Sequence, residues 1–313
     1  MRVLIWLSDG YRRILAIFVA LAGPRNAYRF AERLARILYR SLPFVQSRTE
    51  AQCRAALDGV VPPADIPRLA EQSFVHRQWN LTDLMLADRL LHPNTYARYG
   101  GQIPQPYLDM LLEAQGRRQP VILLTAYYGA YDLLPVFAGY NGIALATVYR
   151  PHRNPRFDAY RNRIRARAGC ELIPIQRALE RVPQVLETGG TVALLADHHT
   201  EGHGVPSTFL GLPTNTSRLV GLLADRFGAV VAVAGIRRTG RPFHFEIEVA
   251  GLLTPQEWRS AEDPVVYITH WYLQAIERIV RAEPAQYLWS YARWGEETAG
   301  QLSGTSLPQW RTQ

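Results

Sequence analysis

The sequence predicts an α/β protein: a mostly parallel central sheet sandwiched by helices, preceded by an N-terminal helical region that associates with a membrane. Short apolar segments of strand length recur from residue 121 onward, helical patterns separate most of them, and an arginine-rich apolar segment stands before them. Such alternation favours parallel strands with helices on both faces. With 313 residues, 48% of them hydrophobic, the chain can bury one large core.

Charge and cysteine content narrow the class of protein. All 35 basic residues are arginine, the formal net charge is +8, and residues 1–54 hold ten arginines against three acidic residues. Cys53 and Cys170 are too few for a disulfide framework and fit a reducing compartment. No helix-turn-helix, zinc knuckle or aromatic-basic RNA signature accompanies the arginines, so nucleic acid is not expected as a partner.

The apolar run from Ile14 to Ala22 is expected to attach the chain to a membrane. It has nine residues between arginines, whereas a spanning helix needs about 20. Extending it backward would bury an aspartate and two arginines, at about 2.5–3.5 kcal/mol each. An interfacial helix with Trp6 and Phe18 in the acyl region is favoured, although the sequence leaves a spanning anchor open. No small-residue cleavage site follows, which disfavours a signal peptide.

Residues 27–42 carry apolar side chains and arginines on opposite faces at helical spacing. Such a stripe is either an ordinary surface helix or a membrane-binding face, and the neighbouring apolar run favours the second. We therefore divide the chain into membrane-associating helices at 1–42, a single α/β domain at 43–300 and a tail at 301–313.

The elements of the domain follow in order. Residues 64–92 and 107–115 show helical periodicity. Short runs rich in apolar residues predict strands at 121–127, 144–149, 171–175, 191–196, 229–236 and 243–250. Helices fit between most of them, at 129–138, 155–168, 177–188 and 215–227, and a closing amphipathic helix spans 265–282. Only the last two strands are predicted to form a hairpin.

The turn after the first strand carries the strongest functional signal. Tyr127 and Asp132 stand at the carboxyl end of that strand, where open α/β sheets bind ligands. The turn reads Ala126-Tyr127-Tyr128-Gly129-Ala130-Tyr131-Asp132. It resembles the turn of the bacterial lipid A biosynthesis (lauroyl/myristoyl) acyltransferases, in the lysophospholipid acyltransferase-like superfamily, which commonly reads Gly-His-Phe-Gly-Asn-Trp-Glu. The acid is kept as Asp132, and Tyr127 replaces the histidine.

Three further segments resemble blocks of this family in the family's order, and together the four blocks cover roughly residues 30 to 295. Val148-Tyr149-Arg150-Pro151 with Asn154-Pro155 resembles its Tyr-Arg-Pro…Asn-Pro segment. Asp197-His198-His199 with the glycine-rich loop and Phe209-Leu210-Gly211 resembles its Asp-Gln-Asp strand end. Pro284-Ala285-Gln286-Tyr287-Leu288-Trp289 with Arg293-Trp294 resembles its ending.

The resemblance implies the glycerolipid acyltransferase-like α/β fold and transfer of a fatty acyl chain to a hydroxyl of a lipid or glycolipid acceptor. The donor would be a thioester of acyl carrier protein or coenzyme A, with no cofactor and no metal. It also implies a protein on the cytoplasmic face of the bacterial inner membrane, peripheral or N-terminally anchored. The candidate catalytic residues are Asp132, Tyr127, His198 and His199; the candidate substrate-binding residues are Arg150, Asn154, Arg163, Asp197, Tyr128 and Gly129.

Tyr127 is a poor replacement for a histidine base. In the family, the histidine takes the proton of the acceptor hydroxyl and the acid orients the imidazole. A phenol with a pKa of about 10 is ionised to roughly one part in a thousand at pH 7, and a nearby carboxylate raises that pKa. Losing the base costs about 10²–10⁴-fold in rate unless another group substitutes. Tyr127 therefore either donates a hydrogen bond to an oxyanion or packs in a site without chemistry.

Other side chains leave the chemistry open. His198 and His199 are expected at the same sheet edge, although loop histidines more often bond nearby backbone. Their cluster with His203 invites a zinc interpretation, which a glycine-rich loop disfavours. Arg150 and Arg163 either bind phosphates through their guanidinium forks or form part of a solvated basic face. Two functions remain: an acyltransferase with a modified site, or a catalytically inactive relative that binds lipid or a partner enzyme.

Overall fold

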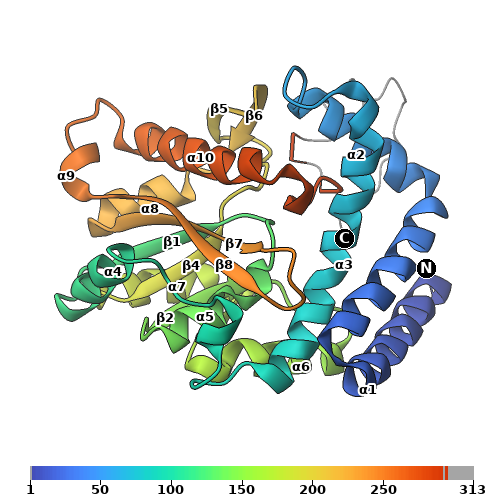
Figure 1. Ribbon diagram of the computed structural model, residues 1–313. Helices are drawn as coiled ribbons and strands as arrows, with labels where there is room; N and C mark the ends of the chain where they lie inside the picture. The colour runs from blue at the N-terminus through green and yellow to red at the C-terminus, as the bar shows by residue number, and fades with distance from the viewer. Residues whose placement is uncertain (1, 292, 295–313) are drawn as a thin grey trace.

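A computed structural model describes residues 2–291 and 293–294, so the tail predicted at 301–313 lies outside the described residues. At its centre is a six-stranded sheet in the order β3-β2-β4-β1-β7-β8 (Figure 1). The strands are β1 (Val121–Thr125), β2 (Leu145–Tyr149), β3 (Glu171–Pro174), β4 (Thr191–Leu195), β7 (Val230–Arg238) and β8 (Phe245–Leu253). All neighbours pair in parallel except β7 and β8. The mostly parallel sheet and its terminal hairpin are thus confirmed.

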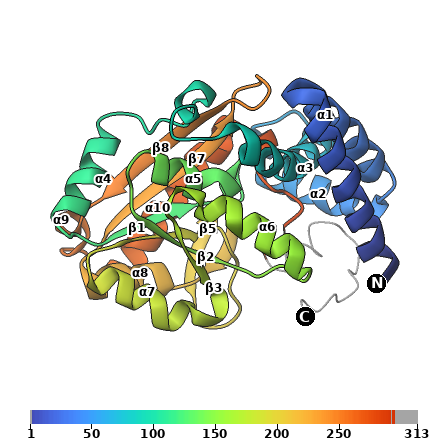
Figure 2. The same ribbon diagram turned by 90° about the horizontal axis from the view of Figure 1, so that it is seen from below.

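Helices cover both faces of the sheet (Figure 2). They are α4 (Tyr107–Gly116), α5 (Leu134–Tyr140), α6 (Pro155–Arg165), α7 (Ala178–Glu187), α8 (Leu219–Phe227), α9 (Pro255–Trp258) and α10 (Pro264–Ala282). Successive side chains of a strand point to opposite faces. Accordingly Ile122 and Leu124 of β1 join the hydrophobic cluster of α7, α8 and α10, whereas Val121 and Leu123 join that of α4 and α5. The whole of β1 is buried, which explains its continuous apolar run.

Three long helices gather at one end of the sandwich (Figures 1 and 2). They are α1 (Arg2–Arg40), α2 (Pro43–Ala56) and α3 (Ile66–Leu90). The two helical stretches predicted before residue 42 are two helical segments of α1, which meet at a kink where Gly23 takes the non-helical φ 71° before Pro24. Helix α2 was not predicted from the sequence. No described helix is long and apolar enough to cross a membrane, and the side chains of Trp6 and Phe18 lie outside the described part.

A buried polar network fastens these helices to the sheet. Arg238 at the end of β7 forms an ion pair with Asp83 of α3, and both side chains are almost fully buried. The Tyr28 hydroxyl of α1 donates to the same carboxylate, and Asn80 accepts from the Arg238 guanidinium at 2.9 Å. A buried charge is tolerated only when such partners surround it. The network therefore fixes α1 and α3 against the end of β7.

Two local predictions were wrong. A helix was expected to begin at residue 215, but residues 205–216 form a separate hairpin of β5 (Val205–Phe209) and β6 (Leu212–Thr216), and α8 begins at Leu219. The side chains of β5 are buried alternately, and the corresponding alternation in the sequence was not recognised as a strand. The helix expected at 129–138 is a turn, then the short helix η3 (Tyr131–Leu133), and then α5. The other 3-10 helices are η1 (Pro63–Asp65), η2 (Tyr96–Tyr99), η4 (Ala166–Ala168), η5 (Ile175–Arg177) and η6 (Pro284–Gln286).

Gly129 explains why the helix cannot begin earlier. Its φ is +55°, in the left-handed region, and a Cβ there would lie 1.8 Å from the carbonyl oxygen of Ile236 in β7. That same oxygen accepts the Ala130 amide at 2.8 Å. The turn lies directly against β7 because residue 129 has no side chain.

We predict that Gly129→Ala lowers the free energy of unfolding by more than about 4 kcal/mol, because it adds a backbone collision to the left-handed strain. Gly240→Ala is the matched control: its φ is +79°, and nothing lies within 4 Å of the added Cβ. It should cost about 1–2 kcal/mol. Urea unfolding followed by circular dichroism measures both, and equal losses would contradict the proposed collision.

Candidate active site at the carboxyl edge of the sheet

Segments far apart in the sequence meet at the carboxyl ends of β1 and β4. The amide of Leu288 donates to the carbonyl of Tyr127 at 2.9 Å, and the amide of Gly129 donates to the carbonyl of Gln286 at 3.0 Å. The turn after β1 is therefore clamped by the C-terminal segment, which supplies one of the matched blocks. The other side of the turn contacts Asp197, which follows the end of β4.

Tyr127 lies at the centre of an aromatic cluster. Its ring meets those of Tyr131, His198 and Tyr291, with centroids 5.1, 5.2 and 5.5 Å away. Its amide donates to Oδ2 of the buried Asp197 at 3.0 Å. Burial first, and then the charge of Asp197, raise the pKa of the Tyr127 phenol. The hydroxyl therefore stays protonated at neutral pH and can donate a hydrogen bond but cannot act as a phenolate base.

His198 supplies an imidazole beside that hydroxyl. Its Nε2 lies 3.4 Å from the Tyr127 oxygen, and its Nδ1 lies 3.3 Å from the carbonyl oxygen of Leu195. A carbonyl can only accept, so the proton belongs on Nδ1 of the neutral ring. Nε2 then carries the lone pair and can accept from Tyr127. The structure thus brings two of the predicted catalytic residues together.

His199 makes its contacts with a different part of the structure, the strand β6. Its Nδ1 is 3.5 Å from the Thr214 hydroxyl of β6, and it pairs across an isolated bridge with Thr216. Burial, and then the charge of Arg293, lower its pKa, so the ring is neutral at pH 7. Arg293 itself is fully buried and donates to Thr214 at 2.7 Å. His199 therefore belongs to the contact between the β5–β6 hairpin and the C-terminal segment.

Asp132 is held by two guanidinium groups. Arg165 forms a hydrogen-bonded ion pair with its carboxylate, and Arg161 lies 3.3 Å away. Burial alone would raise the pKa of Asp132, but these two arginines more than offset that effect and leave the pKa below its ordinary value of 3.8. In the described part of the chain, its hydrogen-bond donors are thus arginines from α6 and not an imidazole.

We predict that Asp132→Asn lowers the free energy of unfolding by about 3 kcal/mol at pH 7, because it leaves two guanidinium groups without a counter-charge. The folded pKa lies below the unfolded one, so this stabilisation is complete above the unfolded value and is lost as pH falls through the folded value. The gap between wild type and variant should stay constant from about pH 8 to pH 5 and narrow at lower pH.

Asp88→Asn is the control for this experiment. Asp88 also pairs with two arginines, Arg163 and Arg167, but its side chain is 21% exposed, so the expected loss is about 1 kcal/mol or less. Chemical unfolding across the pH series gives both curves. A gap for Asp132→Asn no larger than for Asp88→Asn would rule out the strong buried pair.

The predicted binding residues differ in position and in exposure. Arg150 is exposed just after β2 and lies close enough to Tyr127 to affect its pKa. Asn154 caps the N-terminus of α6, because its Oδ1 accepts the amides of Arg156 and Phe157. Tyr128 is fully buried, and Gly129 is buried against β7. Tyr128 and Gly129 therefore help to shape the buried side of the turn.

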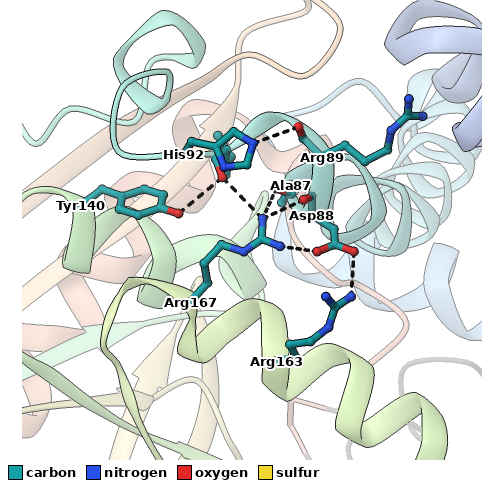
Figure 3. A network of polar contacts seen from close by, with 8 residues as sticks. Ala87, Asp88, Arg89, His92, Tyr140, Arg163 and Arg167 are labelled. Atoms are coloured by element: carbon teal, nitrogen blue, oxygen red, sulfur yellow. Dashed lines mark hydrogen bonds and ion pairs between the residues drawn. The ribbon is translucent and has the colours of Figure 1, made fainter.

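Arg163 points away from the tyrosine cluster, towards α3. Figure 3 shows its guanidinium bonded to the Asp88 carboxylate, with an Nη2–Oδ2 distance of 2.8 Å. Arg167 reaches the same carboxylate and also donates to the carbonyls of Ala87 and Asp88 at the end of the helix. Cations are stabilising at that position. These contacts join α6 and η4 to α3.

Sequence reasoning did not single out Tyr131 and Tyr291, or the partners of Arg161 and Arg165. Tyr131 stood within the matched turn, and its contact with Tyr127 depends on how that turn folds back before η3 begins. Tyr291 lies between Trp289 and Arg293 of the last block. Among the described residues, no group of three or more His, Cys, Asp or Glu side chains could hold a metal ion.

The fold and this edge define an α/β protein whose site lies where parallel strands end, as in enzymes that bind ligands at that edge. A family model described as bacterial lipid A biosynthesis acyltransferase matches residues 5–296. The chain therefore belongs to the bacterial lipid A biosynthesis acyltransferase family. A search of curated proteins finds no match.

Proposed function

We propose that this protein transfers a fatty acyl chain from a thioester donor to a hydroxyl of a lipid A-like acceptor, with His198 acting through Tyr127 in place of the family's histidine. Family membership supports lipid acyl transfer as the reaction class. The observation that carries the modified site is the 3.4 Å approach of the His198 Nε2 to the Tyr127 hydroxyl. Acyl carrier protein and coenzyme A are both possible carriers of the donor.

The proposed step conserves protons and charge. The acceptor hydroxyl oxygen attacks the thioester carbonyl while its proton passes to the Tyr127 oxygen, and the phenol proton passes to Nε2 of His198. The carbon–sulfur bond then breaks and the imidazolium returns a proton, through the phenol, to the departing thiolate. Tyr127 suits this relay because its raised pKa keeps it protonated, so it can donate a proton and accept one in the same step.

The experiment measures thiol release and acyl-lipid formation by the purified full-length protein. The donors are lauroyl thioesters of acyl carrier protein and of coenzyme A, and the acceptor is a lipid A precursor. We expect activity in wild type, a loss of about 10²-fold or more in His198→Gln, and a similar loss in Tyr127→Phe. His270→Gln is the control, because His270 is exposed on α10 and bonds the Pro206 carbonyl.

A second function is favoured by the pairing of Asp132, which leaves its carboxylate with arginines as donors. On this reading the protein is a catalytically inactive family member that binds lipid or a partner enzyme. Activity that appears only in Tyr127→His would support it and would overturn the relay. Wild-type activity that survives His198→Gln would overturn the relay while keeping the reaction.

We also propose that the protein works at the cytoplasmic face of the inner membrane and attaches through α1 and the start of α2. Leu21 is 83% exposed and Ile37 is 62% exposed on α1, and Phe44 is exposed on α2. Four α1 residues, Arg29, Glu32, Arg33 and Arg36, line a surface hollow of about 450 Å³. Exposed apolar and arginine side chains on one helix suit an anionic lipid surface.

Vesicle co-sedimentation tests this attachment. We expect Arg29→Glu/Arg33→Glu to weaken binding to vesicles containing phosphatidylglycerol by about 30-fold or more, since each basic residue near such a surface contributes about 1 kcal/mol. Arg177→Glu/Arg226→Glu alters two exposed arginines on η5 and α8, outside the N-terminal helices, and should have a small effect. Equal losses in the two double variants would exclude a specific attachment through α1.

A further inference from the structure

Residues 286–289 of the C-terminal segment hold the turn that carries Tyr127. The amide of Leu288 donates to the Tyr127 carbonyl at 2.9 Å, and the carbonyl of Gln286 accepts the Gly129 amide at 3.0 Å. Between these two bonds, an isolated antiparallel bridge joins the two stretches of chain. The turn is thus one side of a short antiparallel pair, and its position follows that of the segment with which it pairs.

The side chain of Gln286 fixes this segment to β7. Its Oε1 accepts the amide of Arg238 at 2.9 Å, and its Nε2 donates to the carbonyl of the same residue at 2.9 Å. A primary carboxamide can make both bonds because it carries a donor and an acceptor in one plane, as a peptide group does. The paired register of β1 and β7 ends at Val233. At Arg238 the buried Gln286 amide therefore takes the place of a neighbouring strand.

Two of the N-terminal helices also hold the segment. The Ser73 hydroxyl of α3 donates to the Tyr287 carbonyl and accepts the Trp289 amide at 3.3 Å. The Nε2 of Gln52 in α2 donates to the Trp289 carbonyl at 2.7 Å. Both Ser73 and Gln52 are buried. Side chains from α2, α3 and the segment itself thus fix the backbone to which the turn is bonded.

The contact between Tyr127 and His198 depends on this anchoring. The Tyr127 amide is bonded to Asp197 at 3.0 Å, and the Tyr127 carbonyl is bonded to Leu288, so the peptide groups on both sides of the residue are held. These peptide groups set the direction of the Tyr127 side chain. Its hydroxyl lies 3.4 Å from Nε2 of His198, and a hydrogen bond is lost beyond about 3.5 Å. A small shift of the turn would therefore break the contact.

We propose that Gln286 is a positioning residue of the reaction: it holds the C-terminal segment at β7, so that the turn keeps the Tyr127 hydroxyl within hydrogen-bond distance of His198. The inference rests on the proposed function and extends it to a residue that acts through main-chain bonds. Its side chain bonds the backbone of Arg238, and its own carbonyl bonds the turn. Misplacing a reacting group by about 1 Å can lower a rate by about 10²-fold.

Acyl-transfer kinetics of Gln286→Met test the proposal, since methionine keeps the length of the side chain and removes both hydrogen bonds. We expect kcat to fall by about 10-fold to 10²-fold while KM for the thioester donor stays nearly unchanged, because the orientation of the reacting groups is lost and substrate binding is not. Gln286→Glu keeps an acceptor for the Arg238 amide and should fall between wild type and Gln286→Met. Thermal unfolding verifies that each variant is folded at the assay temperature.

Gln119→Met is the matched control. Gln119 also bonds the main chain, since its Nε2 donates to the Gly228 carbonyl at 2.6 Å, but both residues lie next to the amino ends of β1 and β7. Gln119→Met should keep the wild-type kcat even where its melting temperature falls. An equal loss of kcat in the two methionine variants would overturn the proposal, because a general loss of stability would then explain both.

Nitrogen-15 NMR of histidine-labelled protein tests the positioning without relying on catalysis. The Nε2 signal of His198, assigned with His198→Gln, should shift in Tyr127→Phe, because Nε2 then loses the hydroxyl that bonds it. We expect Gln286→Met to shift the signal in the same direction and Gln119→Met to leave it unchanged. If Gln286→Met does not fold, the milder Gln286→Glu gives the same readout with a smaller shift.

The outcomes separate this role from the proposed reaction. A folded Gln286→Met with the wild-type kcat or the wild-type His198 signal would overturn the positioning role alone. Wild type without acyl transfer, but with a His198 signal that responds to Gln286→Met, would refute the proposed reaction and keep the positioning role. A His198 signal that is the same in wild type and Tyr127→Phe would refute the hydrogen bond that both proposals share.

Discussion

The fixed backbone of the turn after β1 determines the rest of the site. Its amides and carbonyls bond the C-terminal segment, β7 and the carboxylate of Asp197, so the turn has no freedom to start a regular helix. Each buried backbone group must find a partner, and here the partners come from three different parts of the chain. The aromatic cluster depends on the meeting of these segments. Tyr127 and Tyr131 belong to the turn and η3, His198 follows Asp197, and Tyr291 belongs to the C-terminal segment.

Much of the fold could be predicted from the sequence. The six sheet strands were identified because each is a short apolar run, and their parallel order follows from the helices between them. The β5–β6 hairpin was missed because its alternation is short and carries two prolines, which weaken a strand pattern. The two helical segments of α1 were expected separately, and they do meet at Gly23-Pro24, a pair that ordinarily marks a helix boundary.

The candidate site could be predicted only in part. Sequence position alone suggested that His198 and Tyr127 share one edge, since both follow neighbouring parallel strands. The partners of Asp132 could not be predicted, because periodicity says which face of α6 carries Arg161 and Arg165 but not what that face meets. Long-range packing between helices leaves little trace in a single sequence.

The ion pairs of Asp132 also bear on how such a site can change over evolutionary time. A histidine that returned to position 127 by one mutation would face a carboxylate already bound by Arg161 and Arg165. Restoring a histidine–acid pair would require α6 to release that carboxylate, and the guanidinium groups of Arg161 and the buried Arg165 would then need new counter-charges. The carboxylate that a histidine at position 127 would need is thus already bound by residues 29 and 33 positions downstream of Asp132.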